Sequence, residues 1–215
     1  GHSQLLAIIR TKLRQDNRID CDQGYQVMVT AGSNMAFLNV IMAISDPGDE
    51  IILPMPYYFN QEMAIQMLGC VVVPVPTRED YQLDLDALQA AITPKTRAIV
   101  TVSPNNPSGA VYPEQDLRAV NALCQQRGIY HISDEAYEYF TYDGVAHFSP
   151  ANLADAAEHT ISLYSLSKAY GFASWRVGYA VFLEALLPAM LKIQDTNLIC
   201  PPAITQVAAI GALET

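Results

Sequence analysis

The chain alternates short apolar runs with longer segments of helical periodicity, and this alternation limits the folds that it can adopt. Several of the runs are apolar on successive residues, which is typical of strands that are covered on both faces. Seven strands are predicted at residues 27–30, 51–55, 70–75, 98–103, 129–134, 160–165 and 177–182. Seven helices are predicted at residues 4–15 (capped by Ser3), 34–44, 60–68, 85–92, 114–127, 184–195 and 203–213.

Strands that alternate with helices pack into a mostly parallel sheet with helices on both faces. We therefore predict an α/β fold, a three-layer α/β/α sandwich around a mostly parallel seven-stranded sheet. The 215 residues suffice for one large domain, and the 51% of hydrophobic residues excludes a disordered chain. Charged residues make up only 16%, against roughly 25% in an average soluble domain, so some surface is expected to be buried against another chain.

The charge balance and the cysteines exclude several classes of partner. The net charge of −10 argues against nucleic acid or an anionic membrane. The apolar runs are too short to span a bilayer, and residues 1–4 lack the features of a signal peptide. The four cysteines are scattered without a Cys-x-x-Cys pair. We expect a cytoplasmic protein with reduced thiols and no metal site, in which His131 and His147 are structural.

Ligands of open α/β sheets bind beyond the carboxyl ends of the strands, so chemistry is expected just after each strand. Gly32, Ser33 and Asn34 follow the first predicted strand and lead into a helix, whose exposed N–H groups and dipole favour an anion. Taken alone, an ordinary helix N-cap explains this segment better. Asn106 lies in a segment restricted by two prolines and a glycine, which either fixes its side chain or forms a plain turn.

Two further strand ends carry ionisable side chains. Asp134 ends the fifth predicted strand, where a carboxylate needs a cationic or hydrogen-bonding partner unless it caps a following helix. Tyr137 projects to the same side if a helical turn follows. Lys168 follows the sixth strand, which is an unusual place because most lysines are solvated surface groups. A partly desolvated lysine forms Schiff bases with aldehydes, and Arg176 can reach back to an anion.

Together these segments offer an anion cradle, a fixed asparagine, an Asp–Tyr pair and an amine. This combination suits a phosphorylated aldehyde with a ring nitrogen, namely pyridoxal 5′-phosphate.

Several motifs then occur in a recognisable order. They are Asn106-Pro107-Ser108-Gly109, Asp134-Glu135-Ala136-Tyr137, Ser165-Leu166-Ser167-Lys168-Ala169-Tyr170-Gly171 and Arg176-Val177-Gly178. In order and spacing the chain resembles the class I/II aminotransferases of fold type I over essentially its whole length. The resemblance implies a pyridoxal-phosphate-dependent enzyme that exchanges an amino group between an amino acid and a 2-oxo acid.

The resemblance also implies a role for each site residue. Lys168 would hold the cofactor as a Schiff base and then move the proton at the substrate Cα, while Asp134 would keep the ring nitrogen protonated. Tyr137 and Asn106 would hydrogen-bond the ring hydroxyl. A tyrosine, Tyr58 rather than Tyr57, would stack on the ring, although core filling also explains it. The phosphate would be surrounded by Gly32, Ser33, Asn34, Ser165, Ser167 and Arg176.

The resemblance is to one domain of the family. Residues 1–215 match the large cofactor-binding domain, and the N-terminal arm and the C-terminal small domain of the family are expected to be absent. No arginine here matches the one that clamps the substrate carboxylate in that small domain; Arg10, Arg14 and Arg18 look like a solvated face. A fragment of a longer enzyme is therefore favoured over a minimal variant.

Two other functions remain open. A carbon–sulfur β-lyase or a related lyase would use the same carbanion but release a leaving group, and a module that binds the cofactor without catalysis would use none of this chemistry. The resemblance further implies a homodimer that takes amino acid and 2-oxo acid substrates, whose side chains the sequence leaves unidentified.

Overall fold

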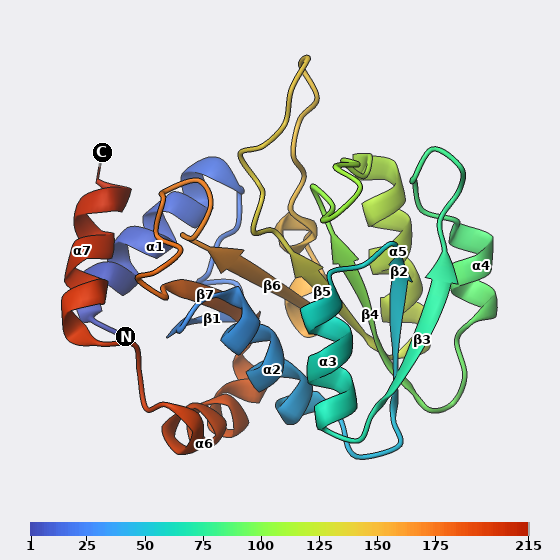
Figure 1. Cartoon of the computed structure of the whole chain (residues 1–215), viewed down its shortest axis with the longest axis horizontal. Helices are drawn as coiled ribbons and strands as arrows, with labels where there is room; N and C mark the ends of the chain where they lie inside the picture. Colours follow the sequence, from blue (N-terminus) through green and yellow to red (C-terminus); the bar gives the residue numbers. More distant parts are fainter. Residues whose placement is uncertain (215) are drawn as a thin grey trace.

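The computed structural model describes residues 1–214 and contains a seven-stranded sheet covered by helices on both faces (Figure 1). Across the sheet the strand order is β1-β7-β6-β5-β4-β2-β3. The strands are β1 (Tyr25–Thr30), β2 (Glu50–Met55), β3 (Val71–Pro76), β4 (Thr96–Val102), β5 (Tyr130–Asp134), β6 (Thr160–Ser165) and β7 (Gly178–Leu183).

The direction of the strands confirms the predicted fold class. β3, β2, β4, β5 and β6 are paired in parallel, whereas β7 runs antiparallel to both of its neighbours, β6 and β1. Because five neighbouring strands run the same way, their carboxyl ends lie at one edge of the sheet. The segments that follow β2, β4, β5 and β6 are thereby brought to that edge.

The helices divide into two layers, as the hydrophobic clusters show. α2 (Ser33–Ile44), α3 (Phe59–Met67) and α6 (Leu187–Asn197) pack on one face through residues such as Phe37, Ile65 and Met190. The other face is covered by α1 (Ser3–Asp16), α4 (Leu85–Ala90), α5 (Glu114–Arg127) and α7 (Ala203–Leu213). Neighbouring strand residues alternate between the two clusters, for example Ile51 and Ile52, so the sheet is the middle of three layers.

Two helix starts differ from the sequence prediction. Ser3 is not the cap of the first helix: the helix begins at Ser3, and Nδ1 of His2 accepts a hydrogen bond from the Gln4 backbone N–H at 3.3 Å. The helix predicted at residues 184–195 was placed too early, because residues Glu184–Leu186 form a 3₁₀ turn and α6 follows it. Pro188 lies in the first turn of α6, where its missing N–H costs nothing.

Candidate active site

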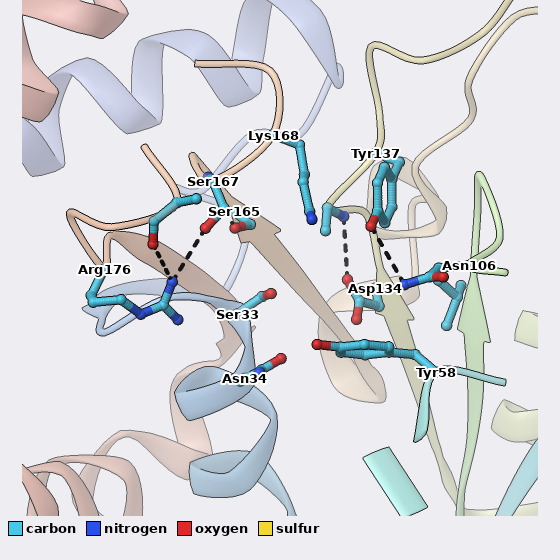
Figure 2. Close-up of a pocket in the computed structure, with 13 residues that line it drawn as sticks. Ser33, Asn34, Tyr58, Asn106, Asp134, Tyr137, Ser165, Ser167, Lys168 and Arg176 are labelled. Carbon is cyan, nitrogen blue, oxygen red and sulfur yellow. Dashed lines mark hydrogen bonds between the residues drawn. The ribbon is translucent and has the colours of Figure 1, made fainter. Parts of the chain in front are cut away.

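A cavity of about 180 Å³ opens at the carboxyl edge of the sheet (Figure 2). Ten of the eleven predicted site residues line it. Its walls are Ser33, Asn34, Tyr58, Val102, Asn106, Asp134, Ala136, Tyr137, Ser165, Ser167, Lys168, Ala173 and Arg176. The remaining predicted residue, Gly32, lies directly behind the wall against Arg176. Segments far apart in the chain therefore meet around one space, which the strand order explains.

One end of the cavity is built to receive an anion. Ser33 and Asn34 form the start of α2, and Figure 2 shows Arg176 beside them. Arg176 donates hydrogen bonds to the backbone oxygens of Ala173 (2.8 Å) and Ala31 (3.2 Å). These acceptors are neutral, so within residues 1–214 no carboxylate pairs with the guanidinium charge. A helix N-terminus beside an uncompensated arginine attracts a doubly charged group such as phosphate.

Glycine is required at two positions of this anion-binding end. Gly32 has a φ of +80°, and a Cβ there would lie 2.3 Å from Nη2 of Arg176. A Cβ on Gly178 would lie 2.6 Å from the Tyr164 carbonyl oxygen and 2.8 Å from the Ser33 nitrogen. Both glycines thus allow the start of α2 to approach the β6–β7 connection closely, which fixes the position of the arginine.

The opposite end of the cavity holds a buried carboxylate. Asp134 is 7% exposed, and its Oδ1 accepts a hydrogen bond from the Ala136 N–H at 3.2 Å. Its Oδ2 accepts one from Nε2 of Gln61 at 2.9 Å. Burial raises the pKa of Asp134 to about 6, against the effect of these two hydrogen bonds. The residues after Asp134 form a turn rather than a helix, so the carboxylate is not a helix cap.

Gln61 was missed by the sequence analysis. It lies in the first turn of α3, three residues after Tyr58, so the two side chains share a face of the helix start. This spacing could have indicated that residue 61 also faces the site. Nothing in the linear sequence connects Gln61 to Asp134. Gln61 lies on the helix that follows β2, whereas Asp134 ends β5, and β4 lies between these two strands in the sheet.

The Lys168 amine lies between the two ends, and two neutral polar side chains, Asn106 and Tyr137, lie at the Asp134 end. In Figure 2 the Lys168 side chain points into the cavity, and its Nζ lies 5.5 Å from the centre of the Tyr137 ring. Asn106 donates a hydrogen bond from Nδ2 to the Tyr137 hydroxyl at 3.4 Å. This hydrogen bond directs the Asn106 side chain toward Tyr137, and the segment that carries Asn106 forms a turn.

Of the two candidate tyrosines, Tyr58 lines the cavity. Its ring lies below Asp134 in Figure 2, and its hydroxyl accepts a hydrogen bond from Nδ2 of Asn60 at 2.6 Å. Tyr57 instead lines an open groove with Met55 and Pro76 and packs against the hydrophobic core.

The donor set of the cavity matches the chemical groups of pyridoxal 5′-phosphate. The anion-binding end and the carboxylate lie at separate places around the space, as the phosphate arm and the basic ring nitrogen of one molecule require. An amine enters between them, and a tyrosine ring supplies a flat apolar surface. The close fit of Gly32 against Arg176 shows that the anion-binding end is shaped by its backbone as well as by its charges.

The two histidines lie outside this cavity. His131 is fully buried, and its ring nitrogens contact Thr101 Oγ1 (2.8 Å) and Asn121 Nδ2 (3.1 Å). Burial lowers the pKa of His131 to about 3, so the ring is neutral at ordinary pH. Nε2 of His147 lies 2.8 Å from Oε2 of Glu135.

Glu135, Glu138 and His147 bring potential metal-ligand atoms within 4.8 Å of one another, a grouping that the sequence analysis did not anticipate. The charge of this cluster is already partly balanced by a protein cation, because Lys12 Nζ lies 2.5 Å from both carboxylate oxygens of Glu138.

None of the helices in residues 1–214 has the length and apolar character needed to cross a membrane.

Comparison with known proteins gives one consistent result. The family described as "Aminotransferase class I and II" matches residues 1–215. The chain is 37% identical to the aspartate/prephenate aminotransferase of Thermus thermophilus, over 99% of its own length and 55% of that protein. It is 36% identical to the aromatic aminotransferase ISS1 of Arabidopsis thaliana, over 100% of its length and 54% of that protein.

Solved structures agree with these relatives. The aromatic aminotransferase from Pyrococcus horikoshii superimposes with a TM-score of 0.94 at 35% identity, over 99% of this chain and 57% of that one. A Thermus thermophilus aspartate aminotransferase variant superimposes with a TM-score of 0.93 at 36% identity, over 99% and 55%. The chain thus spans about half the length of the proteins that it matches.

Proposed function

The chain belongs to the class I and II aminotransferases, and on that basis we propose that it is the cofactor-binding domain of a pyridoxal-phosphate-dependent aminotransferase. The reaction is the exchange of an amino group between an amino acid and a 2-oxo acid. The observation that carries the proposal is the placement of Lys168 between the arginine end and the Asp134 end of a single cavity. The names of the relatives favour aspartate or an aromatic amino acid as the amino donor.

The residues of the cavity would share the binding of the cofactor. Ser33, Asn34, Ser165, Ser167 and Arg176 would hold the phosphate, with Gly32 leaving room for the guanidinium. Asp134 would hold a proton on the ring nitrogen by pairing with it, while Asn106 and Tyr137 would donate to the ring hydroxyl oxygen. Tyr58 would cover one face of the ring. When bound, the cofactor supplies an aldehyde carbon and a ring that withdraws electrons from the substrate Cα.

Lys168 has two tasks in this proposal. Its Nζ would attach the cofactor covalently and, once released by the substrate amine, take the proton from the substrate Cα. The position of the amine inside the cavity supports both tasks, because a base must lie within hydrogen-bond reach of the proton that it moves. Asp134 assists only in its ionised form, so its charge state matters to the whole site.

Borohydride trapping tests the assignment of the lysine. Protein incubated with pyridoxal 5′-phosphate and reduced should carry the label on the peptide that contains Lys168, and Lys168→Ala should remove it. A label that stays on the same peptide in the variant would disprove the assignment. Amino transfer is then measured with aspartate or phenylalanine and 2-oxoglutarate. Release of pyruvate and ammonia without an oxo acid would instead indicate a carbon–sulfur lyase, and cofactor binding without turnover a binding module.

The homodimer, the cytoplasmic location and the limits of the domain remain predictions. Exposed apolar side chains support the dimer, because large ones gather on and beside the last two helices. They are Leu191, Leu198, Ile199, Ile204 and Val207. Sedimentation of the chain as a monomer at micromolar concentration would count against a dimer formed by these residues alone.

A further inference from the structure

The buried side chain of Gln61 makes a single hydrogen bond within the part of the chain that the structure describes. It is 2% exposed in the first turn of α3, and its Nε2 donates to Asp134 Oδ2 at 2.9 Å. Its Oε1 is also buried and has no hydrogen-bond partner within residues 1–214. An unpartnered buried carbonyl oxygen costs free energy that an apolar side chain would not cost. Packing alone therefore does not explain an amide at this position.

The hydrogen bond from Gln61 is made to Asp134, a carboxylate whose ionisation is disfavoured by burial and by a neighbouring negative charge. Burial and the charge of Glu135 both disfavour ionisation of Asp134, and the N–H groups of Ala136 and Gln61 favour it. The other ionisable groups around the cavity are Lys168, Arg176, Tyr137 and Tyr58. Of the donors to Asp134, Gln61 is the one whose side chain can be replaced without changing the backbone.

The same helix turn also fixes the tyrosine that would cover the ring. Tyr58 precedes α3, its carbonyl oxygen accepts a hydrogen bond from the Gln61 N–H at 2.9 Å, and Asn60 holds its hydroxyl. The start of α3 thus determines both the ring surface and the second partner of Asp134. A side chain at position 61 is held as rigidly as the site itself.

We propose that Gln61 is a positioning residue that keeps the Asp134 carboxylate ionised and oriented toward the ring nitrogen of the cofactor. The inference rests on the proposed function, since it concerns the group that would hold the ring nitrogen. With Asp134 ionised, the amide is favourable only with Nε2 toward the carboxylate, which is the orientation in the structure. The bond therefore selects the charged form and fixes the plane of the carboxylate between two donors.

The test titrates Asp134 directly in cofactor-free protein. Carboxyl-¹³C-labelled aspartate gives a resonance that is assigned by its loss in Asp134→Asn. Gln61→Met keeps the length of the side chain but removes the donor, and we expect the pKa of Asp134 to rise by about one unit from a wild-type value near 6. Gln61→Asn, which is one methylene too short to reach, should raise it similarly. Gln66→Met, at an exposed position of the same helix, is the matched control and should change nothing.

Cofactor binding provides the second measurement. In both Gln61 variants the dissociation constant for pyridoxal 5′-phosphate should rise about twofold at pH 7, because only about half of Asp134 is ionised when its pKa is one unit higher, and it should approach the wild-type value at higher pH, where Asp134 ionises again. An unchanged titration of Asp134 in folded Gln61→Met and Gln61→Asn overturns the inference, whatever happens to cofactor binding. Failure of the wild-type chain to bind the cofactor would overturn the proposed function, and it would be seen separately because the titration contains no cofactor.

Discussion

Asp134 and Glu135 are consecutive residues whose buried carboxylates lie on opposite faces of the sheet and have pKa values shifted in opposite directions. Asp134 faces the layer of α3 and contacts Gln61. Glu135 faces the other layer, where its Oε2 contacts His147 and Ser149. Burial raises the pKa of Asp134 to about 6. Burial acts on Glu135 too, but hydrogen bonds from His147 and Ser149 hold the pKa of that carboxyl below its usual range.

The first prediction is that Asp134→Asn stabilises the cofactor-free protein. The raised pKa of Asp134 means that ionising it in the folded state costs free energy, and the isosteric amide removes that cost. A shift from 3.8 to about 6 corresponds to about 3 kcal/mol at most. Urea unfolding at pH 7.5 measures the gain, and turnover with the cofactor should fall by orders of magnitude in the same variant.

The sign of the pH dependence follows from the same shift. A group whose pKa is raised by folding contributes stability that is complete below its unfolded value, 3.8, and lost as the pH rises through about 6. The advantage of Asp134→Asn should therefore grow between pH 4 and 6 and stay constant above that. An advantage that is the same at pH 4 and pH 7.5 would show that the carboxylate charge is not its cause.

The second prediction concerns His147, which lies with Ser149 at the far end of the segment that begins with Glu135. His147→Ala leaves the Glu135 carboxylate with one fewer partner in a fully buried position, so the free energy of unfolding should fall by about 2–3 kcal/mol at pH 7. Adding Glu135→Gln removes the buried charge and should restore part of the loss. A double variant that is less stable than His147→Ala would contradict this account.

The stability supplied by Glu135 has the opposite pH dependence from that of Asp134. Because its pKa is depressed by folding, the contribution is present above the unfolded value of 4.5 and is lost as the pH falls through the lower folded value. In wild-type protein we expect a loss of stability below pH 4.5 that Glu135→Gln reduces. Acid unfolding curves of the two proteins, followed by circular dichroism, measure the difference.

The layer architecture was predictable because the inner strands, such as β4, β6 and β7, are buried on both faces and therefore read as apolar runs. Ile51, Ile52 and Leu53 are all fully buried, although they face alternate sides of the sheet. Helix ends were less predictable, because a capping contact such as that of His2 depends on local geometry that residue type does not determine.

The site was predictable where residues lie next to strand ends, and not where contacts join distant elements. Lys168 and Asp134 could be found because parallel strands bring their carboxyl ends together. Gln61 and Lys12 could not, because their partners Asp134 and Glu138 are 73 and 126 residues away. Lys12 also lies between Arg10 and Arg14 on α1, yet it is buried while Arg10 is half-buried and Arg14 is exposed, since residues two positions apart point to different sides of a helix.

The third prediction separates backbone strain from a clash at the anion-binding end. In Gly32→Ala the new methyl group would lie 2.3 Å from Nη2 of Arg176, so the guanidinium must move. We expect the affinity for pyridoxal 5′-phosphate to fall roughly tenfold, because the proposed charge partner of the phosphate would be displaced. Gly48→Ala is the matched control: its φ is +91°, but nothing lies within 4 Å of the added methyl group. Both variants should lose about 1 kcal/mol of stability through strain at positive φ, and only Gly32→Ala should lose cofactor affinity. Equal affinities in the two folded variants would show that the position of Arg176 does not determine phosphate binding.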